Sequence, residues 1–128
     1  MKIKSTHPFK GNIDIVRLEE LILREGPENV PFIRMEASTN LIEGQPFSMQ
    51  NLRDVRKIAD KYKLIIVLDA SRIGENAFFI QKREEEYKSK SIGLILNEMC
   101  DLSDIVYFSG RNVSSSRGGA ICTNNKDL

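Results

Sequence analysis

Residues 64–68 (Leu-Ile-Ile-Val-Leu) constrain the fold more than any other feature, because the run is continuously apolar and mostly β-branched. Such a run is typical of a strand whose two faces are both covered, as in the interior of a parallel sheet. It ends abruptly at Asp69. Other segments also have the composition of strands: residues 30–37, 105–108 and 118–123.

Helical patterns lie between these strands. Short polar residues stand just before apolar stripes at helical spacing, where a side-chain oxygen can cap the first turn: Asp14, Ser48 and Ser91. A further helix is predicted over residues 76–88, and the charged run 83–86 within it is interpreted as a solvated face. This alternation predicts an α/β fold, in which crossover helices join a mostly parallel sheet of about four strands.

The length, net charge and apolar content of the chain narrow the class of protein. A chain of 128 residues corresponds to a single domain, residues 1–128, with a modest core. A net charge of +1 provides no long-range attraction to nucleic acid or to an anionic membrane, so neither is predicted as a partner. No apolar run approaches the roughly 20 residues of a membrane span. Residues 1–10 lack the apolar stretch of a signal peptide, and a cytoplasmic location is therefore predicted.

The cysteines do not indicate a metal centre. Cys100 and Cys122 are far apart in the sequence and form no CxxC pair, and His7 is the only histidine. This spacing does not match known zinc sites, so no metal site is predicted. We interpret the cysteines as two reduced thiols that pack in the interior.

In open parallel sheets, ligands bind outside the carboxyl ends of the strands. Here those ends carry polar residues: Thr39 and Asn40, then residues 69–72, then residues 109–112. The pattern alone predicts a ligand site at this edge and leaves the ligand open. Each residue also has an ordinary structural interpretation. Asp69 could cap a helix, Arg72 could form a surface ion pair, and Asn40 and Ser109 could be turn residues.

Four groups of residues carry a resemblance to a known family: residues 9–12 (Phe-Lys-Gly-Asn), 40–46 (Asn-Leu-Ile-Glu-Gly-Gln-Pro), 69–80 (Asp-Ala-Ser-Arg, then Glu-Asn-Ala-Phe-Phe-Ile) and 109–111 (Ser-Gly-Arg). In this order and at these separations, the chain resembles the pyridoxal-phosphate-dependent β-eliminating lyases, the family of tryptophanase and tyrosine phenol-lyase. The resemblance implies the large cofactor domain of the aspartate-aminotransferase type (fold type I). This chain would supply its middle strands.

The resemblance also implies roles for four residues. Asp69 corresponds to the carboxylate that pairs with the pyridinium nitrogen of the cofactor, which keeps the ring electron-withdrawing. Arg72 and Asn40 correspond to residues beside its phenolic oxygen, where a cation and an amide favour the ionised form. Ser109 corresponds to a serine that contacts the cofactor phosphate.

The chain departs from the family pattern in three ways. The family places its Schiff-base lysine after a serine, a small residue and a basic residue, and here that position is Asn112. Glu43 replaces a usual glycine, and the family's chains are several times longer. Lys126 lies beyond the last predicted strand and is a poor substitute for the missing lysine. The resemblance therefore implies a catalytically silent pseudoenzyme that does not bind pyridoxal phosphate covalently.

Two functional hypotheses follow from these observations. The first is a truncated relative of an amino-acid β-eliminating lyase, inactive in this form, with tryptophan and tyrosine both open as the ancestral substrate. The alternative is a non-enzymatic α/β module used for self-association or partner binding. A homo-oligomer is expected, because a fragment of a larger sheet has open edges and apolar patches. A complementing lyase fragment is a further open possibility.

Overall fold

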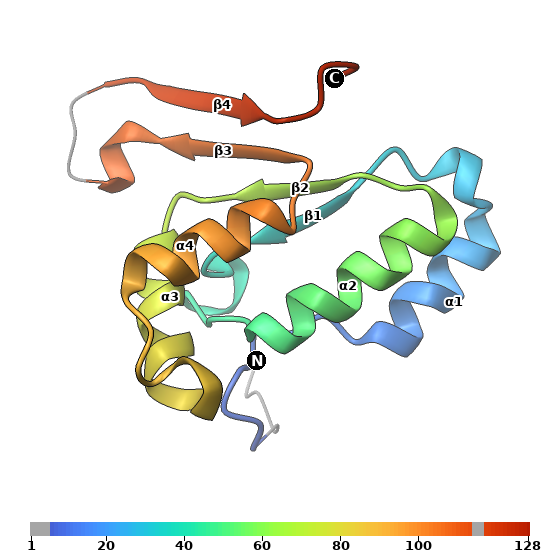
Figure 1. Cartoon of the computed structure of the whole chain (residues 1–128). Coiled ribbons are helices and arrows are strands. Elements are labelled where there is room, and N and C mark those ends of the chain that lie inside the picture. The colour runs from blue at the N-terminus through green and yellow to red at the C-terminus, as the bar shows by residue number, and fades with distance from the viewer. Residues whose placement is uncertain (1–5, 114–116) are drawn as a thin grey trace.

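The computed structural model describes residues 6–113 and 117–128 (Figure 1). The α-helices are α1 (Ile15–Glu25), α2 (Met49–Tyr62), α3 (Ile73–Arg83) and α4 (Ile92–Asp101). The strands are β1 (Ile33–Glu36), β2 (Ile66–Asp69), β3 (Ile105–Ser109) and β4 (Gly119–Thr123). Short 3₁₀ turns include η2 (Asn40–Ile42) after β1, η3 (Glu85–Tyr87) after α3, and η4 (Gly110–Val113) after β3.

The strands form one sheet in the order β1-β2-β3-β4. β1, β2 and β3 are parallel, whereas β4 runs antiparallel to β3. α2 connects β1 to β2, and α3 with α4 connects β2 to β3 (Figure 1). The predicted α/β fold, with a mostly parallel sheet and crossover helices, is confirmed. The carboxyl ends of the three parallel strands consequently lie at one edge of the sheet.

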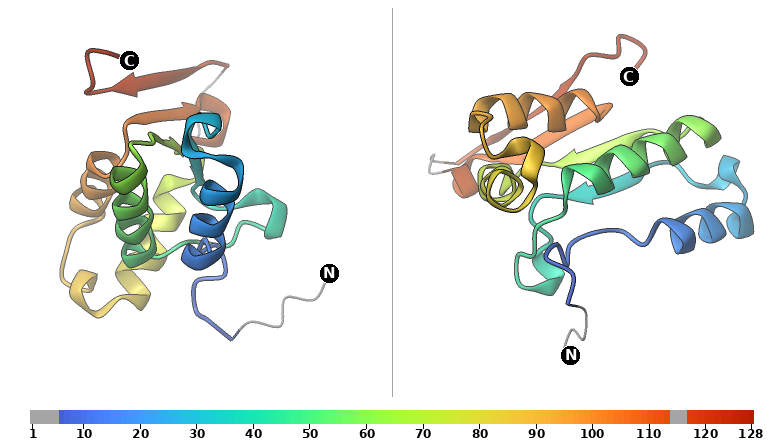
Figure 2. Two further views of the ribbon diagram at one scale, coloured as in Figure 1. Left: turned by 90° about the vertical axis from the view of Figure 1, so that its right-hand side faces the viewer. Right: turned by 60° about the horizontal axis from the view of Figure 1, so that its bottom comes forward.

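The helices cover only one face of the sheet (Figure 2). Met35 of β1 and Leu68 of β2 point to that face and join a single core cluster to which all four α-helices contribute. On the opposite face Val67 is half-buried, because no helix of residues 6–113 and 117–128 packs over it. The prediction that residues 64–68 are covered on both faces is therefore wrong within this chain.

The predicted caps are confirmed at the amino ends of three helices. The Asp14 carboxylate accepts a hydrogen bond from the Arg17 amide at 3.2 Å, and α1 ends at Gly26. The Ser48 hydroxyl accepts from the amide of Asn51 at 3.0 Å. The corresponding bond in α4 joins the amide of Leu94 to Ser91 Oγ at 3.3 Å. These bonds satisfy backbone donors that the first helical turn leaves free.

The third helix differs from the prediction at both ends. It spans Ile73–Arg83 instead of residues 76–88, so the charged run 83–86 is not a solvated helix face. Glu84 turns back to the start of α2 and accepts hydrogen bonds from the amides of Met49 and Gln50 at 2.7 and 3.3 Å. Burial raises the pKa of this carboxyl group. Glu84 thus links the end of α3 to the amino end of α2.

β4 is the exposed edge of the sheet, and every one of its residues is exposed. Cys122 lies in this strand and is exposed, so the prediction of two interior thiols is wrong for it. Cys100 on α4 is partly buried. Within the described residues, no helix is long and apolar enough to cross a membrane. Residues 1–5, part of the segment predicted to lack a signal peptide, lie outside the described residues.

Candidate functional site at the strand ends

The fold brings the four residues of the predicted site to one edge of the sheet. Asn40 begins η2 just after β1, and Asp69 is the last residue of β2. Arg72 lies immediately before α3, and Ser109 is the last residue of β3. Since β1, β2 and β3 are parallel neighbours, these residues follow adjacent strand ends. Their placement agrees with the expected position of a ligand site in such a sheet.

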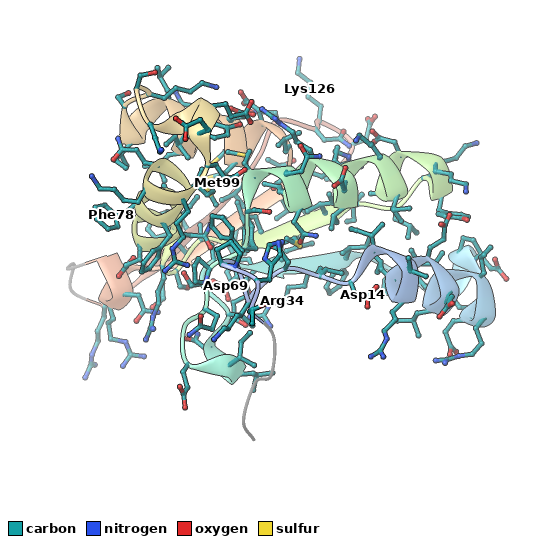
Figure 3. The ribbon with its side chains drawn as sticks, turned by 90° about the horizontal axis from the view of Figure 1, so that it is seen from below. Asp14, Arg34, Asp69, Phe78, Met99 and Lys126 are labelled. Carbon is teal, nitrogen blue, oxygen red and sulfur yellow. The ribbon has the colours of Figure 1, made fainter. Side chains whose placement is uncertain are left out.

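Asp69 is buried at the centre of a hydrogen-bond network that spans three strands. Its Oδ2 accepts from Arg34 Nη2 of β1 at 2.7 Å and from the Tyr107 hydroxyl of β3 at 2.8 Å. Its Oδ1 accepts from the Ser71 amide at 3.1 Å. Arg34 Nε also donates to the Tyr107 oxygen at 3.0 Å, and Figure 3 shows Arg34 beside Asp69. The three side chains form a closed triangle.

These contacts govern the ionisation of Asp69. Burial by itself would raise the pKa of the carboxyl group, but hydrogen bonds from Ser71, Arg34 and Tyr107 outweigh it and hold the pKa below its usual value. The Tyr107 pKa is raised by burial and by the bond to Asp69. Asp69 is therefore the ionised member of the network and Tyr107 its neutral donor.

Asn40 has a partner within the same edge of the sheet. Its Nδ2 donates to Glu36 Oε1 at 2.7 Å. The side chain of Glu36 is 13% exposed and lies 3.9 Å from Arg34 Nη2. A carboxylate therefore stands next to the amide that the resemblance places against an ionised phenolic oxygen. A second negative charge at this position would be repelled.

Arg72 lies against the loop that follows η2. A Cβ atom added at Gly44 would stand 2.9 Å from Arg72 Nη1, so the guanidinium lies against this glycine. Within residues 6–113 and 117–128 the Arg72 side chain forms no ion pair, which excludes the simple surface-pair interpretation for this part of the chain. Glu43 and Gly44 have φ angles of 65° and 71°, so Glu43 adopts the left-handed conformation that favours glycine.

The end of β3 places Asn112 in η4, where it is exposed. Lys126 lies elsewhere. Because β4 runs antiparallel to β3, its carboxyl end lies beside the amino end of β3, as the pairing of Thr123 with Ile105 indicates. Lys126 follows that end and stands far from Asp69 in Figure 3. The prediction that Lys126 is a poor substitute is supported by this topology.

Two motif residues near the amino terminus hold the backbone that leads into α2. The Gly11 amide donates to the Pro46 carbonyl at 3.0 Å. Asn12 Oδ1 accepts from the Ser48 amide at 2.8 Å. Sequence reasoning identified residues 9–12 and 40–46 as separate parts of the resemblance, and the fold shows that they meet directly.

Asn76 of α3 holds Phe47, which lies in the linker between η2 and α2 (residues 43–48). Its side chain is fully buried and forms two hydrogen bonds of 3.0 Å with the backbone of Phe47, accepting from the amide and donating to the carbonyl. The motif in residues 69–80 contains Asn76 but does not reveal this role. The available signal is its spacing, since Asn76 lies three residues after Ile73 and four before Ile80, on the face of the helix that packs against the core.

Arg34, Glu36 and Tyr107 were also missed as members of the site. The alternation of β1 places Arg34 and Glu36 on the polar face, but it cannot show that β2 and β3 lie beside that face. Register supplies this information, since Glu36 aligns with Asp69 and Asp69 with Tyr107. Arg34 and Tyr107 become partners of Asp69 only through the order and register of the strands. Glu36 and Asn40, in contrast, are only four residues apart in the sequence.

The residues at this edge do not fit a pyridoxal phosphate held in the manner that the resemblance implies. An ionised carboxylate has about four acceptor positions, and three of those on Asp69 are already used. The Asn40 amide is bonded to Glu36. Asn112 carries no amine. The position of the site agrees with the resemblance, whereas its present contacts do not.

Comparison with known proteins identifies the family of this chain. The family model for β-eliminating lyases matches residues 1–128. A protein named tyrosine phenol-lyase from Nostoc punctiforme is 44% identical over 126 residues, which are 98% of this chain and 27% of that protein. One of the same name from Pasteurella multocida is 41% identical over 122 residues, 94% of this chain and 27% of that protein.

A probable β-eliminating lyase from Trichomonas vaginalis is 42% identical over 118 residues, which are 92% of this chain and 24% of that protein. The chain thus spans about a quarter of the length of these relatives. The match over the whole chain and the α/β fold agree with the motifs at the strand ends. This chain belongs to the β-eliminating lyase family, whose enzymes use pyridoxal phosphate.

Proposed function

We propose that the chain is a single-domain part of the cofactor domain of a cytoplasmic β-eliminating lyase, and that in this form it does not catalyse β-elimination. The observation that carries the proposal is Asn112 in η4, just after β3, where the resemblance places the lysine of the Schiff base. Asn40, Asp69, Arg72 and Ser109 are then residues retained from an ancestral cofactor site. Relatives named tyrosine phenol-lyase favour tyrosine as the substrate of the parent enzyme.

The chemistry of Asn112 supports this proposal. An amide nitrogen shares its lone pair with the carbonyl group, so it neither adds to an aldehyde nor accepts a proton near neutral pH. Arg111 beside it carries a guanidinium group, which is not a nucleophile. Lys126 lies at the opposite edge of the sheet. No amine of the described strand-end residues is therefore available to hold an aldehyde cofactor.

The first prediction is that pyridoxal phosphate forms no specific covalent adduct with the chain. After incubation with excess cofactor and reduction with borohydride, mass spectrometry should find only scattered labelling of surface lysines. A full-length tyrosine phenol-lyase treated in parallel should be labelled stoichiometrically at one lysine. The Asn112→Lys variant of this chain should release no phenol, indole or pyruvate, because the chain spans only 27% of the length of the Nostoc punctiforme relative. Stoichiometric labelling of one lysine in the wild-type chain would contradict the proposal.

We also propose that the chain self-associates through the face of the sheet that the helices leave open. Ile121 of β4 aligns with Tyr107 and therefore lies on this face, where it is 78% exposed. Val67 and Ile105 on the same face are only half-buried. Exposed apolar groups beside an unpaired strand edge favour association with another copy.

The second prediction follows from this arrangement. Sedimentation velocity across a dilution series should show a species larger than a monomer, and Ile121→Lys should shift the distribution toward the monomer. Leu94→Lys is the matched control, because Leu94 is also exposed but lies on α4, on the helical side of the sheet. Monomer mass at every concentration of the wild-type chain would refute self-association.

A further inference from the structure

The network around Asp69 contains its own cation. Arg34 lies on β1, Asp69 on β2 and Tyr107 on β3, and all three side chains are on the face opposite the helices. Arg34 Nη2 stands 2.7 Å from Asp69 Oδ2, a length typical of a charge-assisted bond. The Asp69 pairing raises the pKa of Arg34, which stays protonated. The carboxylate therefore has a permanent counter-ion from within the chain.

This counter-ion and a protonated pyridine ring would compete for the same carboxylate. A pyridinium N–H is a single charged donor that needs a free lone pair on a carboxylate oxygen. Oδ2 already accepts from Arg34 and Tyr107, and Oδ1 accepts from the Ser71 amide. Both acceptor positions of Oδ2 are therefore filled, and a ring nitrogen that bonded this oxygen would have to displace a charged or hydroxyl donor. The displaced donor would then lose its bond. The position that is left on Oδ1 belongs to a residue that is 6% exposed.

We propose that Arg34, supported by Tyr107, takes the place that the pyridinium nitrogen of the cofactor would have beside Asp69. The site is therefore also closed to non-covalent binding of the cofactor ring. The inference goes beyond the proposed function, which rests on Asn112 and concerns only the covalent link. Arg34 and Tyr107 are positioning residues for Asp69. They keep it ionised and occupy both acceptor positions of Oδ2.

Glu36 supports this inference from the other side of the network. It bonds the amide of Asn40 at 2.7 Å and lies 3.9 Å from Arg34. The guanidinium thus stands between two carboxylates, Glu36 and Asp69, and balances part of their charge. A ring with an ionised oxygen near Asn40 would meet the Glu36 carboxylate. The chain itself thus supplies a hydrogen-bond partner for Asn40 and a counter-ion for Asp69.

The third prediction tests the substitution directly through the pKa of Asp69. Carbon-13 NMR of the full chain with labelled aspartate should find the Asp69 carboxyl pKa below its usual value. Arg34→Met should raise that pKa by about one unit or more, the usual effect of removing a close opposite charge. Arg17→Met is the matched control, since Arg17 pairs with Asp14 on exposed α1 and should leave Asp69 unchanged. An Asp69 pKa that Arg34→Met does not alter would overturn the inference.

A second measurement uses pyridoxamine phosphate, a form of the cofactor that has no aldehyde. Its binding is independent of a lysine at position 112, so the result is separate from the borohydride experiment. Addition of the compound to the wild-type chain should leave the Asp69 carboxyl resonance in place. A saturable shift of that resonance would show that the ring reaches Asp69 past Arg34, and would overturn the inference. Stoichiometric labelling of one lysine by pyridoxal phosphate in the borohydride experiment would contradict the proposed function alone.

Discussion

Replacing Asn76 with alanine should lower the free energy of unfolding by about 3 kcal/mol, because two backbone groups would lose their partners in the interior. Asn76 and Phe47 are both fully buried. The amide and the carbonyl of Phe47 each bond the Asn76 side chain at 3.0 Å. A buried polar group left without a partner costs about 1–3 kcal/mol, and alanine cannot replace either bond. The truncation also leaves a small cavity in the core.

Urea denaturation of the wild-type chain and the variant gives this difference as a change in midpoint at constant slope. Asn29→Ala is the matched control. Asn29 also donates to a backbone carbonyl, that of Glu25 at 2.8 Å, but it is exposed and water can replace the bond. The control should cost about 0.5 kcal/mol or less. Equal midpoints for the two variants would mean that Asn76 does not hold the linker at Phe47.

Local structure was the part of the fold that the sequence predicted best. Ser48 and Ser91 each stand before an apolar stripe, and each caps the helix that was expected from this pattern. Caps of this kind depend on residues three positions apart, so the information is contained in a short segment. The prediction was less accurate where a segment has tertiary partners. Glu84 leaves the helical path and bonds the amino end of α2, which no local pattern reveals.

The position of the site was also predictable, but its contacts were not. Asp69 ends an apolar run, and the end of a parallel strand is the usual place of a ligand site. Its partners come from two other strands, and they depend on the strand order and on a register in which Asp69 aligns with Tyr107. A shift of one residue would turn Tyr107 to the helical face. Arg34 and Tyr107 are 35 and 38 residues from Asp69 in the sequence, and these separations do not determine the strand order or the register.

The motifs of the resemblance combine residues of the candidate site with residues that stabilise the fold. Its motifs include residues at the strand ends, such as Asp69, and residues such as Asn76 that hold the backbone between η2 and α2. A scaffold residue keeps its role whether or not a cofactor binds. Under the proposed function, in which Asn112 replaces the lysine, the chain still retains Asn76 because the fold depends on it. Retained motifs in this chain are consequently better indicators of fold than of activity.

Gly11 allows a direct test of whether a motif residue is retained because it stabilises the fold. Its amide bonds the Pro46 carbonyl, and a Cβ atom added at Gly11 would stand 2.4 Å from the carbonyl oxygen of Gln45 and 2.8 Å from that of Pro46. The obstructing atoms belong to the backbone, so they cannot rotate away as a side chain would. Gly11→Ala should therefore displace either residues 9–12 or the linker, at a cost of about 1–3 kcal/mol, the range for overpacking.

Gly74→Ala is a control of opposite sign. Gly74 lies in α3, and a Cβ atom there would have nothing within 4 Å. Alanine loses less backbone entropy than glycine when a helix forms, so this variant should gain about 0.5 kcal/mol. Both free energies can be measured by urea denaturation of the full chain. If Gly11→Ala were as stable as the wild-type chain, the contact between residues 9–12 and the linker would be loose. The meeting of the two motifs would then not explain why this chain retains them.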